Sequence, residues 1–200
     1  MNDFRLYFPI GIRHIINWEG YDHILFIMVL CSSYVFRNWR KILTLITAFT
    51  LGHSITLALS VLHWISFSSN WVEVLIPVTI ALTALNNIRK NKTNSGFQIP
   101  NYVWVIFFGF IHGMGFASAL RSLLGHQNQI FIPLLAFNLG LEAGQLVVVS
   151  IVLLISFLIT KLSRLPQAYW NEILSWMIFF IALILLYIRI HTTNLLHFDS

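Results

Sequence analysis

Residues 130–160 read IFIPLLAFNLGLEAGQLVVVSIVLLISFLIT, and this long stretch carries a single charged side chain, Glu142. A helix needs about 20 apolar residues to cross the hydrocarbon core of a bilayer. A strand of a membrane barrel needs only about 9–11 residues and alternates apolar with polar side chains. The stretch is therefore predicted to be a membrane-spanning helix that tilts or projects beyond the bilayer.

Five further apolar runs lie on either side of this stretch. They cover residues 22–36, 42–64, 71–88, 102–124 and 170–190. The first run is short, and residues 4–16 before it mix apolar with basic side chains, as an interfacial or partly inserted segment does. The sequence therefore predicts an all-α, polytopic membrane helical bundle that forms one integral membrane domain over residues 1–200. It has six transmembrane helices, or seven if the N-terminal segment inserts.

The composition supports a membrane protein. Hydrophobic residues make up 58% of the 200 residues and charged residues 10%, against roughly 45–50% and 25% in soluble chains. A soluble globule of this size could not cover itself with so few polar side chains. A soluble enzyme, a disordered chain and a nucleic-acid-binding protein are therefore poor interpretations, despite a net charge of +5.

Basic residues are distributed unevenly between the two sets of loops. Most of the 12 Lys and Arg residues follow the first, third and fifth predicted spans: Arg37, Arg40, Lys41, Arg89, Lys90, Lys92, Lys161 and Arg164. The others are Arg5, Arg13, Arg121 and Arg189. Because basic loops are retained on the cytoplasmic side, both termini are predicted to lie outside the cytoplasm.

Several polar side chains lie inside the predicted spans at a similar depth. Asp22 and His23 open the first span, while His53 and His112 occupy the centres of the second and fourth. A carboxylate at the bilayer centre costs about 2.5–3.5 kcal/mol, so Glu142 in the fifth span must face the bundle and be neutralised by a proton or a cation. We therefore expect these five residues from four helices to meet in the outer half of the bundle.

Three imidazoles and two carboxylates without a thiolate form a nitrogen and oxygen donor set. Such a set suits a divalent transition metal of the zinc, nickel or cobalt type. Polar side chains beside such ligands commonly fix the imidazole tautomers, and Ser54, Asn138 and Gln145 are the candidates for that role. The alternative is a purely structural role, in which these side chains form a hydrogen-bonded polar core that holds the helices together.

Four segments of the chain carry a family resemblance. They are HIINWEGYDH at 14–23, FTLGHSITL at 49–57, FGFIHGMGFASAL at 108–120 and FNLGLEAGQL at 137–146. In these segments the sequence resembles the HupE/UreJ family of small bacterial membrane proteins, whose members are regarded as nickel and cobalt permeases. The resemblance implies a multi-pass protein of the bacterial cytoplasmic (inner) membrane. It also implies metal-ligand roles for the residues of these motifs, namely His14, Asp22, His23, His53, His112 and Glu142.

These residues are compatible with two functions that use a bound metal ion. The first is a secondary permease for Ni, Co or Zn ions that uses the intramembrane histidines and acids. The second is an intramembrane zinc-dependent hydrolase acting on a lipid or acyl-linked substrate, with Glu142 or Asp22 as general base and Ser54 as a candidate nucleophile. The expected partners are a metal ion or a lipid-like substrate and the membrane lipids, and a homo-oligomer is also compatible. Whether His14 reaches the other ligands is left open.

Overall fold

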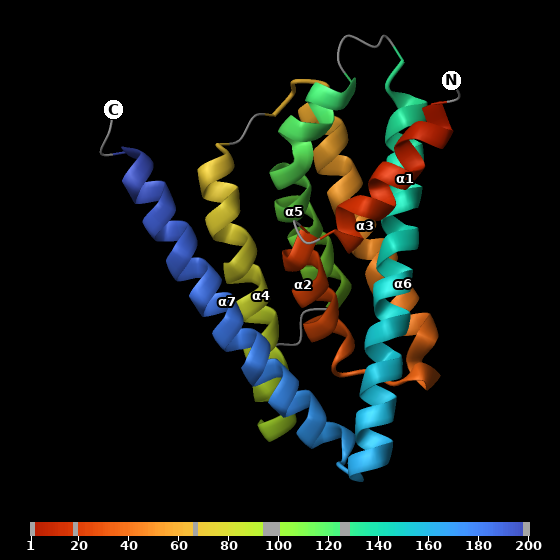
Figure 1. Cartoon of the computed structure of the whole chain (residues 1–200), viewed down its shortest axis with the longest axis vertical. Coiled ribbons are helices and arrows are strands. Elements are labelled where there is room, and N and C mark those ends of the chain that lie inside the picture. Colours follow the sequence, from red (N-terminus) through yellow and green to blue (C-terminus); the bar gives the residue numbers. More distant parts are fainter. Residues whose placement is uncertain (1–2, 18–19, 66–67, 94–100, 125–128, 198–200) are drawn as a thin grey trace.

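The computed structural model describes residues 3–17, 20–65, 68–93, 101–124 and 129–197. Within these ranges the chain folds into seven α-helices and one short 3-10 helix (Figure 1). Their bounds are α1 Asp3–Ile16, α2 Tyr21–Cys31, η2 Phe36–Asn38, α3 Trp39–Val61, α4 Ser69–Thr93, α5 Asn101–Leu124, α6 Phe131–Ser163 and α7 Gln167–His197. The predicted all-α bundle is confirmed.

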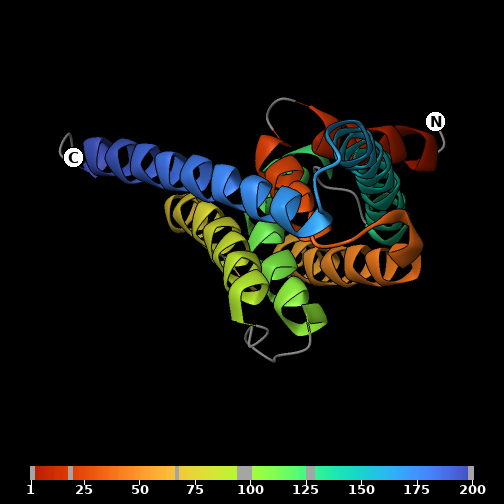
Figure 2. The same ribbon diagram turned by 90° about the horizontal axis from the view of Figure 1, so that it is seen from below.

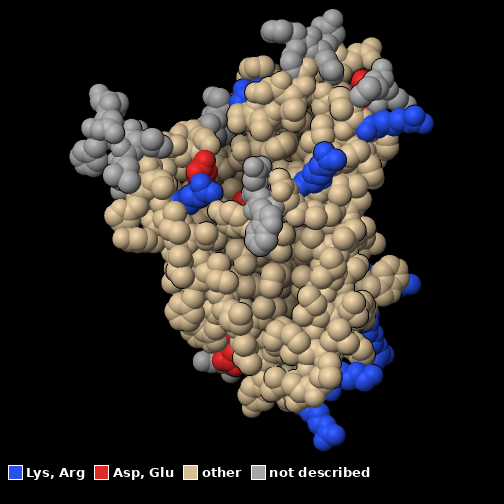
Figure 3. Space-filling model, viewed as in Figure 1, with Lys and Arg blue, Asp and Glu red and all other residues tan. Residues whose placement is uncertain are grey.

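Five of the described helices are long and apolar enough to cross a membrane. These spans are Phe36–Val61, Ser69–Arg89, Tyr102–Leu124, Phe131–Ser163 and Gln167–Thr193. They correspond to five of the six predicted runs, and the start of α1 and the end of α7 lie at the same end of the molecule (Figure 1). On the face shown in Figure 3, charged side chains lie toward the two ends, and the surface between them is almost entirely uncharged.

The remaining predicted span, residues 22–36, is wrong in length. The helix α2 has 11 residues, which at 1.5 Å per residue covers only about half of a hydrocarbon core roughly 30 Å thick. In Figure 1, α1 descends from the upper end to the middle of the bundle, and α2 continues from there to the lower end. The helices α1 and α2 are thus two short helices in succession, and neither is among the helices long and apolar enough to cross a membrane.

Small residues bring two pairs of helices into close contact. A Cβ atom at Gly52 of α3 would collide with the carbonyl oxygen of Ile106, and one at Gly109 of α5 would collide with that of Phe49. Glycines at such positions let helix backbones approach closely in a membrane, where packing rather than hydrophobicity drives association. The helices α1 and α6 approach each other in the same way at Gly11 and Gly140.

The helices α4 and α7 pair with each other on one side of the bundle, and Figures 1 and 2 show that the upper part of α7 diverges from the remaining helices. A buried polar contact joins this pair to α2 at its lower end. The hydroxyl of Ser32 donates to Oδ1 of Asn171 at 2.6 Å, and the amide of Asn87 donates to the carbonyl oxygen of Val29 at 2.7 Å. The lower end of α2 is thereby fixed between α4 and α7.

Candidate metal-binding site

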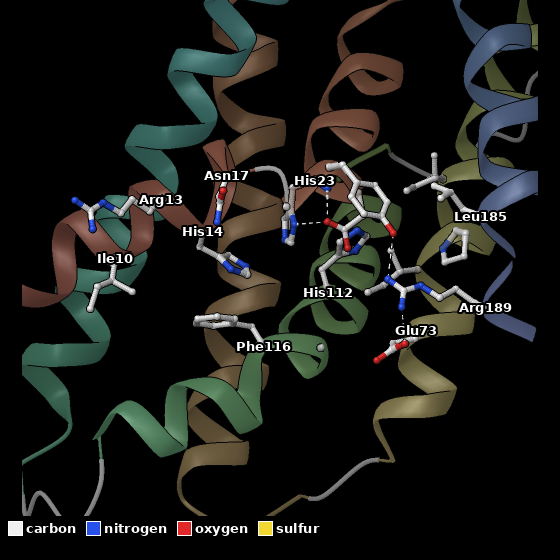
Figure 4. Close-up of a pocket in the computed structure, with 17 residues that line it drawn as sticks. Ile10, Arg13, His14, Asn17, His23, Glu73, His112, Phe116, Leu185 and Arg189 are labelled. Atoms are coloured by element: carbon white, nitrogen blue, oxygen red, sulfur yellow. Dashed lines mark hydrogen bonds and ion pairs between the residues drawn. The ribbon is translucent and has the colours of Figure 1, made fainter. Parts of the chain in front are cut away.

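The break between α1 and α2 places three of the predicted residues in the interior. His14 lies in the last turn of α1, and Asp22 and His23 lie in the first turn of α2. The turn between the helices is tight, because a Cβ at the buried Gly20 would collide with the carbonyl oxygen of His14. Figure 4 shows His14, His23 and His112 projecting into one pocket from α1, α2 and α5.

Four histidine rings from four helices form one group, which we call the histidine cluster: His14, His23, His53 and His112. The ring centroids lie 4.8 Å apart for His14 and His23, and 5.0 Å apart for His23 and His112. His53 lies 5.9 Å from both His14 and His23. Imidazoles bound at about 2.0–2.1 Å to one tetrahedral ion have ring centroids roughly 5 Å apart. The ring-centroid distances in the cluster are thus close to those expected of imidazoles that bind one ion.

The hydrogen bonds of two of these rings leave a free lone pair on each. The Nδ1 of His112 lies 2.9 Å from the carbonyl oxygen of Phe108, and the Nδ1 of His23 lies 2.8 Å from Oδ1 of Asp22. A carbonyl or carboxylate oxygen can only accept, so each Nδ1 carries a proton, and in the neutral form of the ring Nε2 is the acceptor. This arrangement, in which an outer partner fixes the tautomer, is typical of metal-binding histidines.

Several ring nitrogens of the cluster are buried and have no hydrogen-bond partner among the described residues. They are Nε2 of His14, His23 and His112 and both ring nitrogens of His53. A buried polar atom without a hydrogen bond costs about 1–3 kcal/mol, so several such atoms in one place indicate a site for a ligand. No three His, Cys, Asp or Glu side chains in the described part already hold their donor atoms around one point. Binding of an ion therefore requires the rings to turn.

A cavity of about 340 Å³ lies beside the cluster. His14, His23 and His112 form part of its wall, and His53 lies fully buried behind them. The cavity is enclosed by α1, α2, α4, α5 and α7, at the level where α2 begins. The short helix α2 therefore leaves room within the bundle that a full span would have filled.

A charged contact lies on the side of the cavity toward α4 and α7. Arg189 donates to Oε2 of Glu73 at 2.8 Å and to the hydroxyl of Tyr21 at 3.1 Å. Both members of the ion pair are partly exposed, which marks the place where the cavity reaches the surface. Sequence reasoning missed Tyr21 and Arg189. The signal was the single Arg within the apolar stretch FFIALILLYIRI at residues 179–190.

Three aromatic rings pack near the histidine cluster, and two of them lie against the ring of His112. Phe26, Phe49 and Phe108 are all buried. The rings of Phe26 and Phe49 lie 5.5 and 5.2 Å from the ring of His112, and the ring of Phe108 lies 5.7 Å from that of Phe26. We call these three residues the aromatic floor. They separate the histidine cluster from the lower half of the bundle.

Glu142, which the sequence predicts as a further ligand, forms no hydrogen bond or ion pair with the histidine cluster within the described residues, and its ligand role stays a prediction. Its Oε1 accepts a hydrogen bond from the hydroxyl of Thr47 at 2.6 Å. Thr47 precedes His53 by six residues, or about 9 Å along the helix axis. Glu142 is not among the residues that line the cavity, and its hydrogen bond joins α6 to α3.

The three residues expected to support the ligands also bond elsewhere. Gln145 accepts from the hydroxyl of Thr50 at 2.9 Å, and Ser54 donates to the carbonyl oxygen of the same Thr50 at 2.6 Å. The amide of Asn138 donates to the carbonyl oxygen of Leu134 at 2.9 Å. The partners that hold the imidazoles are instead Asp22 and the backbone of Phe108.

The fold and the cluster define a class: a polytopic α-helical membrane protein with a histidine-lined chamber inside the bundle. Residues 1–192 match the model of the HupE/UreJ protein family, and the chain belongs to this family. The family is associated with nickel and cobalt transport, so the chain is a metal-handling membrane protein in this broad sense. No curated protein and no solved structure matches the chain.

Proposed function

We propose that the protein is a permease for a divalent transition-metal ion, which binds to the histidine cluster within the membrane. The observation that carries this proposal is the meeting of four imidazoles from α1, α2, α3 and α5. Each of them has at least one buried nitrogen without a partner in the described residues. Ionisable groups inside a membrane bundle commonly mark the path of an ion or substrate.

The donor set restricts the class of ion. Imidazole nitrogens suit Zn²⁺, Ni²⁺ and Co²⁺, whereas Mg²⁺ and Ca²⁺ prefer oxygen ligands. Asp22 does not act as a free ligand in this arrangement, because its carboxylate is bonded to the ring of His23. Its role is to keep the Nε2 lone pair of His23 available for the ion.

The surroundings of the cluster favour transport over hydrolysis. A zinc hydrolase needs a general base or a nucleophile beside the bound water. The candidates are engaged elsewhere: Asp22 with His23, Glu142 with Thr47, and the Ser54 hydroxyl with its own helix. A cavity that reaches the surface, beside a buried cluster that packs against an aromatic floor, is the geometry expected of one state of an alternating-access carrier.

Metal binding to the full chain, purified in detergent and stripped with a chelator, tests the proposal. We expect calorimetry and elemental analysis to find about one Ni²⁺, Co²⁺ or Zn²⁺ per chain, as one tetrahedral site requires. His53→Ala and His112→Ala should lose this binding and the uptake of the ion into vesicles. His191→Ala is the matched control, because His191 is exposed on α7. Binding that persists in both cluster variants would refute the proposal.

A further inference from the structure

The cavity beside the histidine cluster is larger than a bare metal ion needs. Its volume of about 340 Å³ falls within the roughly 300–1,000 Å³ of pockets that bind small organic molecules. More of its wall is apolar than polar, as is usual for such pockets, and the apolar part includes Ile76, Ile80 and Phe116. The size and the lining therefore fit a metal ion that arrives together with an organic ligand.

The side chains of the cluster do not by themselves complete the coordination of an ion. No three His, Cys, Asp or Glu side chains in the described part hold their donor atoms around one point. Two imidazoles that line the cavity, those of His23 and His112, have ring centroids 5.0 Å apart and buried Nε2 atoms without a described partner. An ion held by two imidazoles keeps positions open for further ligands. A cargo that carries its own donor atoms fills these positions.

The charges around the cavity also favour an anionic companion for the ion. The described wall carries two basic and two acidic side chains, whose formal charges cancel: Arg13, Arg189, Asp22 and Glu73. Imidazoles bind a metal in their neutral form, so a divalent ion adds two positive charges that the cluster does not balance. A buried charge without a partner is costly, and an anion bound to the ion removes this cost. A metal complex of low net charge therefore fits the cavity better than the bare ion.

A place for this anion lies on the side of the cavity away from His14. Arg189 reaches the pocket there from α7 (Figure 4). Its guanidinium donates to Glu73 and to Tyr21 and so uses two of its five N–H groups in the described residues. The Tyr21 oxygen accepts from Arg189, which leaves the hydroxyl proton for another acceptor. Guanidinium groups bind carboxylates through charge-assisted hydrogen bonds, so these two side chains provide donors for a carboxylate group.

We propose that the permease takes up its metal as a complex with a small polycarboxylate, in which His23 and His112 bind the metal while Arg189 and Tyr21 bind a carboxylate of the chelator. The inference rests on the proposed function, because it names the form in which the ion enters the cluster. Tyr21 and His23 lie in the same first turn of α2, so the two parts of the site are adjacent. A carboxylate must stay free after the metal is chelated, which selects polycarboxylates such as citrate.

Equilibrium dialysis of the full chain, stripped of metal and kept in detergent, against radioactive Ni²⁺ and radioactive citrate tests the proposal. The wild type is expected to retain both labels, with one citrate for each nickel ion. Arg189→Met should lower the citrate retained per nickel ion at least about tenfold, because hydrogen bonds to charged groups contribute that much to affinity. Arg5→Gln is the matched control and should retain both labels as the wild type does, because Arg5 is exposed on α1 and does not line the cavity.

Two further variants separate the possible failures. Tyr21→Phe removes a single hydroxyl and should lower the citrate per nickel ion about threefold or more, even if Arg189→Met folds poorly. His112→Ala should lose both labels. Citrate that only withdraws Ni²⁺ from the wild type and is never retained would overturn the chelate and leave the permease standing. Citrate retained equally by the wild type, Arg189→Met and Tyr21→Phe would overturn the carboxylate site. A wild type that binds no Ni²⁺ with or without citrate would refute the permease itself.

Discussion

Replacing Gly109 by alanine should weaken metal binding, although glycine has no side chain that could bind the ion. A Cβ at this position would collide with the carbonyl oxygen of Phe49 and lie 3.0 Å from the backbone nitrogen of His53. Both obstacles are backbone atoms that cannot rotate away. To restore ordinary C···O separations of about 3.3–3.6 Å, the helices α3 and α5 must move apart by on the order of 1 Å. That movement separates His53 from His112.

The magnitude follows from two opposing effects. Alanine gains up to about 1 kcal/mol over glycine in a helix, whereas overpacking a tight contact costs about 1–3 kcal/mol. The net loss of stability in Gly109→Ala is therefore at most about 2 kcal/mol, and the protein should still fold. Metal–nitrogen bonds tolerate only about 0.2 Å of error, so the affinity for Ni²⁺ should fall at least about tenfold, or 1.4 kcal/mol.

The same helix provides a matched control at Gly115. A Cβ there would meet only the ends of two flexible side chains, Ile76 at 3.4 Å and Val72 at 3.5 Å, which are ordinary contacts. Gly115→Ala should therefore bind Ni²⁺ as the wild type does and unfold at the same or a higher temperature. Calorimetric titration and thermal unfolding in detergent measure both effects. Equal Ni²⁺ affinity in the two variants would refute the argument that helix contact at Gly109 sets the ligand spacing.

Three other substitutions test separate parts of the structure. Asp22→Asn should weaken Ni²⁺ binding about 10–100-fold, because it removes the carboxylate that fixes the tautomer of His23; an unchanged affinity in calorimetry would exclude that role. Asn171→Leu should cost about 1–2 kcal/mol in the free energy of unfolding, because the buried hydroxyls of Ser32 and Ser175 lose their hydrogen bonds to Asn171, and Ser32 keeps only the carbonyl oxygen of Val29. Arg189→Met should change unfolding by less than about 1 kcal/mol, because its ion pair is partly exposed. A larger loss in Arg189→Met than in Asn171→Leu would contradict this order.

The sequence predicts the helices and the depth of the histidines well, for a simple physical reason. Runs of apolar residues determine both the spans and the level of each residue within them. His53, His112 and His23 were expected at one depth, and the structure brings these rings together. Whether they bind an ion stays a prediction.

The direction in which each side chain points could not be predicted in the same way. Glu142 was predicted as a further ligand, and the face that α6 turns toward the histidines depends on its close contact with α1 at Gly11 and Gly140. The succession of two short helices, α1 and α2, was also not predicted. Hydropathy gives the length of an apolar run but does not show that two short helices lie end to end in the bundle. The contact between Arg189 and Tyr21 joins residues far apart in the chain, so no local pattern indicates it.

The aromatic floor has a consequence for how an ion could pass. Phe26 follows His23 by three residues, while Phe49 and Phe108 precede His53 and His112 by four. Each of these three helices therefore carries a histidine of the cluster and, one turn away, a ring of the aromatic floor. A tilt or rotation that opens the barrier necessarily pulls the ligands apart. If the proposed permease function holds, the same movement would release the ion and open the barrier, as expected of a carrier rather than of a continuously open pore.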